Sequence, residues 1–344
     1  MNYTNNITLK QPFYKRITIN FSSIIENILC ILLTLTIILL LSNPSRYTKS
    51  VLAGSSLFYF SVMPSLLPFF FISKILFNFK LTGKFINSLG KPMTKIFKLP
   101  PVSSYIFFMS ILCGYPVGAK LLGELYANGQ LSKDDCKRIL IVGTTSGPIF
   151  IIGSVGAGLF GDPLLGLYIF ICHLLSSLIT AILLTRKMKN NNTSTFQFSS
   201  SKVENILNDT VYSTIISIFT VAVYISVFYM FIDMAYDIKI LSFISNPIEK
   251  IFTKINISTD FAKGIASGLI EMTRGLADIK FTTNLKLKLI ISTSLISFGG
   301  LSVFIQSMTF LNKTKIKALY LLKIKCIQLI TSIIVSTIFA IIVY

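Results

Sequence analysis

Charged residues are scarce in this chain of 344 residues. Asp, Glu, Lys and Arg together make up 13% of the sequence, against 53% hydrophobic residues. A soluble protein of this length does not have so apolar a composition. Apolar runs of roughly 20 residues, long enough to cross about 30 Å of hydrocarbon as a helix, recur at Phe21–Ser42, 139–160 and 319–344. The sequence therefore predicts an all-α polytopic membrane protein.

Acidic residues are especially few, because 13 Asp and Glu stand against 32 Lys and Arg, a formal net charge of +19. In a soluble protein this excess would suggest nucleic acid binding, but no basic stretch is interleaved with aromatic residues outside an apolar context. The basic residues cluster between the apolar runs, a pattern typical of cytosolic loops beside anionic lipid headgroups. We therefore expect membrane lipid, and no nucleic acid, as a partner. The N-terminus is expected in the cytosol, and a homo-oligomer remains open.

Residues for metal or redox chemistry are also few. The single histidine cannot assemble a multi-histidine metal site, and the cysteines are odd in number with no C-x-x-C pair, which indicates small apolar fillers. No Walker loop, G-x-S-x-G or H-E-x-x-H motif occurs. We therefore predict no enzyme, no catalytic residues, no metal and no cofactor, and leave H⁺ or Na⁺ open as a coupling ion.

The chain repeats itself. Residues 92–97 (PMTKIF) recur as 247–252 (PIEKIF), and both copies have apolar residues at helical spacing with lysines opposite, the pattern of a helix lying in the membrane interface. After each copy comes an apolar run too short to span, then a glycine-bearing break, with Gly118 and Gly275 157 residues apart. A long span with its own break follows in each half, with Gly147 and Gly300 153 residues apart.

These landmarks predict the domain organisation. Residues 1–50 form an N-terminal cytosolic segment and a retained leading helix, since no small-residue cleavage site follows the first apolar stretch. The first repeat covers 51–185, a polar linker 186–209, and the second repeat 210–344. Each half reads as a span, an interfacial helix, a re-entrant hairpin, a broken span and a span. Three crossings per half force the second copy to be inverted, which is the inverted-repeat plan of secondary transporters.

The four breaks predict a binding site. Irregular backbone at bilayer depth persists only where it is buried in protein or lines a wet cavity, and helix N-termini there suit an anion or a carboxylate. The competing interpretation is that the glycines and serines only pack helices closely. The candidates in the breaks are Gly114, Tyr115, Pro116, Gly118, Thr145, Ser146, Gly147, Thr273, Gly275, Gly299, Gly300 and Ser302, with Gln306 in the following half-helix.

Three charged residues complete the candidate site. Glu271 and Arg274 lie three positions apart at the second hairpin tip, where an unpaired charge is costly. Either they form a structural ion pair, or Arg274 faces a substrate carboxylate while Glu271 takes a coupling proton or cation. Lys120, at the first tip, is a second potential carboxylate partner, unless its side chain extends to the cytosolic interface.

Three segments carry a resemblance. They are 110–126, with the motif G-Y-P-x-G-A-K, then T-S-G-P at 145–148, and 268–275, with G-L-x-E-x-T-x-G. Together they resemble the YlbJ (SpoVV) family of sporulation integral membrane proteins over about 50–340. That family carries the nucleoside-recognition Gate domain and is similar in architecture to concentrative nucleoside transporters.

The resemblance implies a transporter that moves dipicolinate from the mother-cell cytosol across the outer forespore membrane of endospore-forming bacteria. Half-helix N-termini with Arg274 and Lys120 would suit the two carboxylates of this small anionic substrate. Met272 and Arg274 occupy positions taken as variable in the motif, so the motif alone does not support an ion-coupling role for Glu271. A nucleoside-type transporter and a non-transporting structural sporulation membrane protein remain the alternatives.

Overall fold

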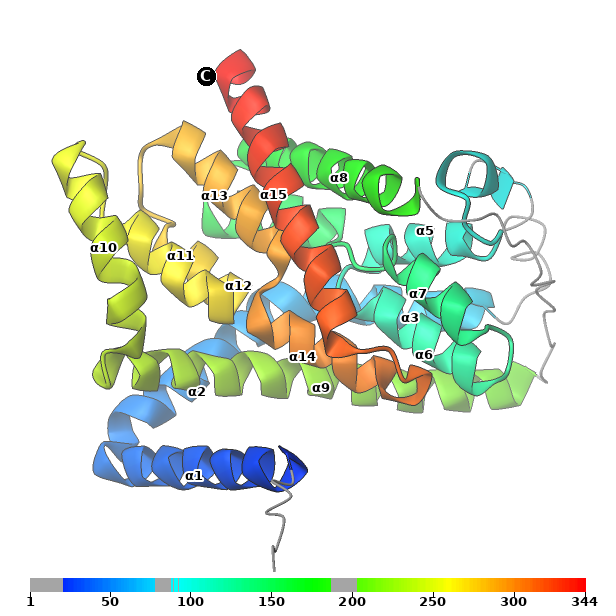
Figure 1. Cartoon of the computed structure of the whole chain (residues 1–344), viewed down its shortest axis with the longest axis horizontal. Coiled ribbons are helices and arrows are strands. Elements are labelled where there is room, and N and C mark those ends of the chain that lie inside the picture. Colours follow the sequence, from blue (N-terminus) through cyan, green and yellow to red (C-terminus); the bar gives the residue numbers. More distant parts are fainter. Residues whose placement is uncertain (1–20, 78–87, 89, 92, 187–202) are drawn as a thin grey trace, which may run out of the picture. The chain divides into compact units, whose positions relative to one another are not determined.

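The computed structural model describes residues 21–77, 88, 90, 91, 93–186 and 203–344 (Figure 1). The described residues form helices and connecting turns, with no strand among them. By internal contacts the chain divides into two units, Met1–Ser45 and Arg46–Tyr344. The all-helical prediction is therefore confirmed for this part of the chain.

The first unit contains the predicted leading helix, α1 (Phe21–Ser42). Residues 28–41 of this helix are apolar except for Thr34 and Thr36, and large side chains such as Ile31 and Leu41 are about two-thirds exposed, at 67% and 70%. An apolar helix with an exposed apolar surface of this length suits contact with lipid.

The first half of the second unit contains eight elements with described bounds. The predicted interfacial helix at 92–97 is described only in part: residues 93–97 are helical, and residue 92 lies outside the described residues. The elements are α2 (Pro44–Leu57), the π-helical turn η1 (Phe58–Val62), α3 (Met63–Phe77), α5 (Ser103–Cys113), α6 (Val117–Ala127), α7 (Lys133–Leu140), the π-helical η2 (Ile149–Leu159) and α8 (Pro163–Thr185).

The second half begins earlier than predicted, because α9 (Val203–Asp237) starts inside the linker expected at 186–209. Residues 187–202 of that linker lie outside the described residues. The further elements are α10 (Ile240–Lys254), α11 (Asp260–Ile270), α12 (Met272–Asp278), α13 (Leu285–Phe298), α14 (Gly300–Leu311), the short 3₁₀ turn η3 (Asn312–Thr314) and α15 (Ala318–Val343).

Four described helices are long and apolar enough to cross a membrane: Pro163–Thr185, Ile206–Asp237, Leu285–Thr314 and Ala318–Val343. The number rises to five if residues 26–42 and 44–62 count as one span. The third of these helices contains the break at Gly299. These lengths support an integral, multi-pass membrane protein.

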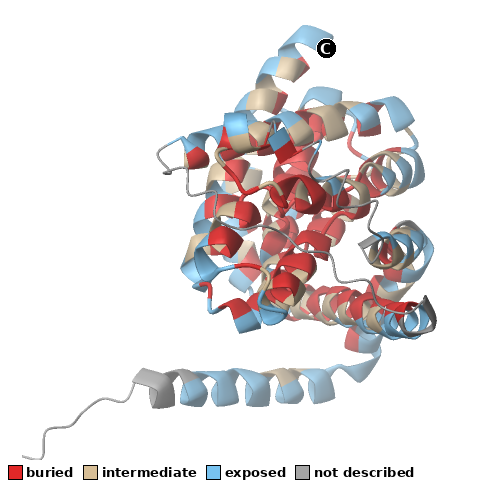
Figure 2. Ribbon diagram, turned by 90° about the vertical axis from the view of Figure 1, so that its right-hand side faces the viewer, coloured by how far each residue is buried: buried red, intermediate tan, exposed pale blue. Residues whose placement is uncertain are grey.

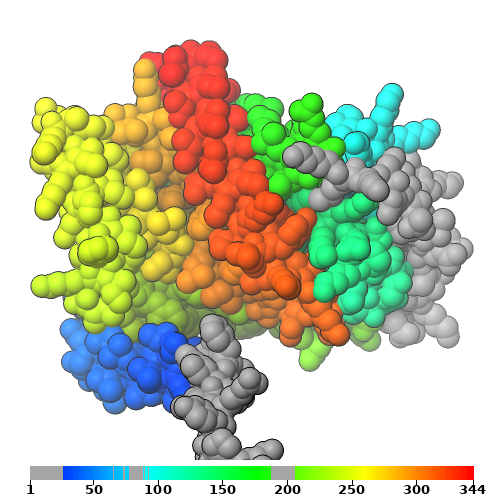
Figure 3. All heavy atoms as spheres, in the orientation of Figure 1, coloured from blue at the N-terminus to red at the C-terminus, as the bar shows by residue number. Residues whose placement is uncertain are grey.

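The core of the second unit forms where α8, α13 and α15 pack on one another (Figure 1). Buried residues gather where the helices meet, while exposed residues cover the outside (Figure 2). In the space-filling view, α15 crosses the visible face of this unit (Figure 3). Helix α8 also packs on η2, where Gly166 of α8 faces Gly156 of η2. A Cβ built at Gly166 would lie 2.8 Å from the Gly156 Cα. This close approach of backbones requires glycine.

Candidate functional site

The two breaks of the first half lie against each other. The first separates α5 from α6 at residues 114–116, and the second separates α7 from η2 at 141–148. A Cβ built at Gly114 would lie 2.9 Å from the backbone nitrogen of Gly147, and one at Gly147 would lie 2.9 Å from the carbonyl oxygen of Leu112. Gly114 also has a φ of +75°, a conformation that glycine adopts without steric cost. The two glycines therefore allow direct contact between the broken segments.

The two breaks of the second half meet in a similar way. Helix α11 ends at Ile270 and α12 begins at Met272, while α13 and α14 are separated at Gly299. A Cβ at Gly300 would lie 2.9 Å from the carbonyl oxygens of both Gly268 and Ile270. Gly299 and Gly300 have φ values of +83° and +71°. In each half, then, the hairpin break packs on the break in the following span.

Gly118 and Gly275 lie at close packing contacts of the two hairpins. A Cβ at Gly118 would be 1.9 Å from the carbonyl oxygen of Gly143, and one at Gly275 would be 2.5 Å from that of Gly264. At these two predicted site residues the packing interpretation accounts for the glycine.

A small cavity lies among the four breaks. Its volume is about 30 Å³, which is room for water but not for an organic solute. Three of the breaks supply lining residues directly, and α14, which begins at the fourth break, supplies two more. The lining consists of Val62, Leu66, Cys113, Gly114, Tyr115, Ser146, Phe150, Val221, Ile225, Glu271, Met272, Thr273, Val303 and Gln306.

Glu271 supplies the carboxylate among these lining residues. It is 1% exposed and precedes α12, where its side chain accepts a hydrogen bond of 2.9 Å from the backbone N–H of Arg274. The hydroxyl of Thr273 donates to the same carboxylate oxygen. Glu271 is thus the N-cap of α12, with its carboxylate at the end of a helix where negative charge is stabilised.

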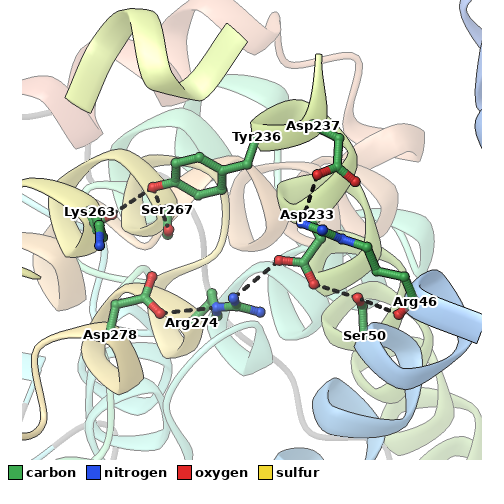
Figure 4. A network of polar contacts seen from close by, with 9 residues as sticks. All are labelled: Arg46, Ser50, Asp233, Tyr236, Asp237, Lys263, Ser267, Arg274 and Asp278. Carbon is green, nitrogen blue, oxygen red and sulfur yellow. Dashed lines mark hydrogen bonds and ion pairs between the residues drawn. The ribbon is translucent and has the colours of Figure 1, made fainter. Parts of the chain in front are cut away.

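Arg274 points away from Glu271. Its Nη2 lies 3.1 Å from Oδ1 of Asp233 on α9, and its Nε lies 3.1 Å from Oδ1 of Asp278 on α12 (Figure 4). The guanidinium also lies over the ring of Tyr229, 5.3 Å from its centroid. Arg274 therefore forms its ion pairs with two aspartates, and the alternative in which it pairs with Glu271 is not the arrangement in this structure. The guanidinium joins α12 to α9, and Arg274 is outside the cavity lining.

The same polar network reaches α2 and α11. Ser50 donates to Asp233, and Arg46 Nη2 lies 2.7 Å from Oδ1 of Asp237 (Figure 4). On the other side the hydroxyl of Tyr236 lies 3.3 Å from Ser267 Oγ. Asp233 is thus a central acceptor of this network. The network anchors the second hairpin to α2 and α9.

Lys120 also lies away from the central cavity. Its Nζ donates to Ser213 Oγ at 2.7 Å and lies 3.9 Å from Glu124. It lines a second cavity of about 550 Å³, together with Lys74 and Lys313. Of the three charged residues predicted for the site, Glu271 alone lines the central cavity.

The remaining candidate residues lie in the breaks or next to them. Gln306 Nε2 donates to Ser302 Oγ at 3.1 Å, and both side chains are buried. Thr145 is 1% exposed, and its hydroxyl has no hydrogen-bond partner among the described residues. Pro116 follows Tyr115 through a cis peptide bond.

His173 on α8 bridges two breaks. Its Nε2 accepts a hydrogen bond of 3.0 Å from the backbone N–H of Ser146, and its Nδ1 lies 2.8 Å from Ser297 Oγ. Because Nε2 accepts, the ring is neutral and Nδ1 carries the proton that is donated to Ser297.

Lys325 on α15 is a buried charged residue that the sequence analysis did not single out. It is 1% exposed, and its Nζ lies 2.7 Å from Tyr115 Oη, 3.1 Å from the Thr144 carbonyl and 3.3 Å from the Ser297 carbonyl. Nζ is also 4.1 Å from the Tyr115 ring centroid. One signal was available, since a lysine inside a 26-residue apolar helix is expensive unless partnered.

The cysteines fit their interpretation as fillers. Cys113, Cys136 and Cys172 are buried, and burial raises the pKa of the Cys136 thiol to about 12, which keeps it protonated. Within the described residues no group of three or more His, Cys, Asp or Glu side chains is arranged to hold a metal ion.

The chain is similar in sequence to a known membrane protein. It is 28% identical over 308 residues to the "Sporulation integral membrane protein YlbJ" of Bacillus subtilis (strain 168), covering 83% of this chain and 74% of that protein. No protein-family model matches the chain, and no solved structure matches it. The similarity covers most of both lengths, and together with the long apolar helices it supports an integral membrane protein.

Proposed function

We propose that the protein is a secondary transporter of a small organic solute, which binds in the cavity between the four helix breaks. The observation that carries this proposal is that residues from three of the breaks, at Gly114, Ser146 and Glu271, line one small cavity together with Val303 and Gln306 of α14. Each unpaired backbone group would cost several kcal/mol in lipid, so broken helices at bilayer depth favour a binding site.

The order of elements supports the inverted-repeat part of the proposal. A short helix, a break and a second short helix (α5 and α6) precede a broken segment and the long helix α8. The series α11, α12, α13, α14 and α15 follows the same order, and α5 and α11 both have 11 residues. We propose that the halves are inverted repeats with two re-entrant hairpins, the plan on which transporters build a midplane site.

We propose a small organic anion as substrate, with dipicolinate as the specific candidate from the family resemblance, carried across the outer forespore membrane. Arg274 and Lys120 do not line the cavity, so we reassign the favourable positive charge to Lys325, which contacts the lining residue Tyr115. An anion beside Glu271 would be repelled unless that carboxyl carries a proton. This version of the proposal therefore favours H⁺ over Na⁺ as the coupling ion.

A specific observation favours a nucleoside-type substrate as the second candidate. Among the described lining residues the strongest polar groups are the Glu271 carboxylate and the Gln306 amide, and none is a basic side chain. A carboxylate and an amide are suited to the hydroxyls of a sugar and the N–H groups of a base.

Uptake into proteoliposomes tests both candidates. Purified protein would be offered labelled dipicolinate or labelled nucleosides, with a H⁺ gradient, a Na⁺ gradient or neither. Dipicolinate accumulation driven by H⁺ supports the first candidate, and nucleoside accumulation supports the second. Absence of flux for both, with protein shown to be folded, would retire transport and leave the non-transporting alternative.

A further inference from the structure

The strongest unexplained feature is the environment of the Lys325 ammonium. The hydrogen bonds from Nζ all go to neutral oxygens: the Tyr115 hydroxyl, the Thr144 and Ser297 carbonyls, and Gln328 Oε1 at 3.2 Å. Among the described residues no carboxylate forms an ion pair with it. A buried charge normally has a counter-charge, and this one has oxygen dipoles instead.

Such a shell resembles the coordination of a monovalent metal ion. Backbone carbonyls from unwound helix segments replace the hydration shell of Na⁺ or K⁺ in transporters and channels. Here the two carbonyls come from one break in each half, at Thr144 and Ser297, while Tyr115 belongs to a third break. The ammonium therefore holds three breaks together from a single point.

We propose that the Lys325 ammonium is a tethered cation that fills an internal monovalent-cation site. The oxygens of Tyr115, Thr144, Ser297 and Gln328 form this site, and its ligand class is a small monovalent cation such as K⁺, Na⁺ or an alkylammonium ion. The protein therefore needs no dissociable metal ion at this position. This inference deepens the proposed function, because it assigns a fixed charge behind the cavity wall, in contact with the lining residue Tyr115.

The proposal predicts that removal of the side chain uncovers the site. In Lys325→Ala the four oxygens remain and the space of the butylammonium chain becomes free. A free cation can then bind and stabilise the fold, since a ligand that binds only the native state raises the melting temperature. In Lys325→Met the apolar side chain occupies the same space and leaves no room for the ion.

The test is thermal unfolding of detergent-purified protein at equal ionic strength in choline, sodium, potassium or ethylammonium chloride. We expect the wild type to melt at the same temperature in all four salts. Lys325→Ala should melt lower in choline and gain roughly 3 °C or more in at least one of the other salts. Lys325→Met should melt lower without that gain, and Lys323→Ala, at an exposed position of the same helix, should behave as the wild type.

Two results would overturn the proposal. One is a wild type selectively stabilised by Na⁺ or K⁺ at a site that Lys325→Ala abolishes. The other is a Lys325→Ala protein that responds to none of the cations, or that fails to fold in any of the four salts. The assay measures no transport, so its outcome is independent of whether the uptake experiment identifies a substrate.

Discussion

The last helices of the two halves, α8 and α15, both hydrogen-bond to broken segments, but α8 does so through an acceptor and α15 through a donor. In α8, His173 accepts a hydrogen bond from a backbone N–H of one break, at Ser146. In α15, Lys325 donates to backbone carbonyls of two breaks, at Thr144 and Ser297. The Nδ1 of His173 also hydrogen-bonds to the hydroxyl of Ser297. Each helix therefore links the broken segment of the first half to that of the second.

The difference follows from what a helix break leaves unpaired. A break frees N–H groups where the next helix begins and C=O groups where the previous one ends. A neutral imidazole supplies an acceptor for the first kind, and an ammonium supplies donors for the second. Because both side chains lie in apolar helices, the breaks gain partners without admitting water. The comparison indicates that the cavity wall is held by side chains from outside the breaks.

The largest effect is expected for Lys325→Met. This change leaves two buried carbonyls and one hydroxyl with fewer donors, each worth roughly 1–3 kcal/mol. We expect a loss of about 3 kcal/mol in stability, or roughly 4 °C in melting temperature measured in choline chloride. Lys323→Met is the matched control, because Lys323 is exposed on the same helix. Equal melting of Lys325→Met and wild type would show that desolvation of the ammonium cancels its hydrogen bonds.

The next effect is expected for Gly118→Ala, which tests the contact between hairpin and broken span. The added Cβ would meet the Gly143 carbonyl and Ser110 Oγ, so backbone must move at a cost of about 2–3 kcal/mol. Gly153→Ala is the control, since its nearest neighbour would be an Ile149 methyl at 3.9 Å. Thermal unfolding compares the two. If both melt alike, the close approach at Gly118 is not a constraint on the fold.

His173→Leu is expected to cost about 2 kcal/mol, less than the lysine change. It leaves one backbone N–H, at Ser146, and one hydroxyl, at Ser297, without their partner. His173→Asn should recover part of the loss, because an amide can both accept and donate. The measurement is the melting temperature, which should fall in the order wild type, His173→Asn and His173→Leu. If His173→Leu melts at the same temperature as the wild type, the contacts of His173 on α8 do not stabilise the breaks.

The smallest effect is expected in the network of Figure 4. A double-mutant cycle of Arg274→Gln with Asp233→Asn should give a coupling energy of roughly 1 kcal/mol, because the pair is partly buried. The cycle of Arg274→Gln with Glu271→Gln should give little, since Glu271 contacts only the backbone N–H of Arg274. A larger coupling energy in the second cycle would indicate that Glu271 and Arg274 form an ion pair, which is one of the two alternatives that the sequence suggested.

The positions of the breaks could be predicted from sequence because their causes are local. Glycine at 114 and 299 permits a positive φ, and an interrupted apolar run is visible without any tertiary information. Glu271 is likewise recognisable, since a carboxylate inside a membrane segment is rare and costly.

The partners of the charged residues could not be predicted, because they come from elsewhere in the chain. Arg274 pairs with Asp233, 41 residues away, and Lys325 binds Tyr115, 210 residues away. Sequence spacing favoured the local pair of Glu271 and Arg274, whereas packing of α12 on α9 offered two aspartates instead. Lys120 similarly donates a hydrogen bond to Ser213 on α9, 93 residues away.

The most direct test of the central claim uses Cys113, a native thiol in the cavity lining. A variant that retains this cysteine alone would be reconstituted and treated with N-ethylmaleimide, with and without the transported solute. We predict that modification stops uptake and that the solute slows modification. In a variant that retains Cys326 alone, which is exposed, the reagent should affect neither. Complete modification of Cys113 with unchanged uptake would contradict transport through the cavity between the four breaks.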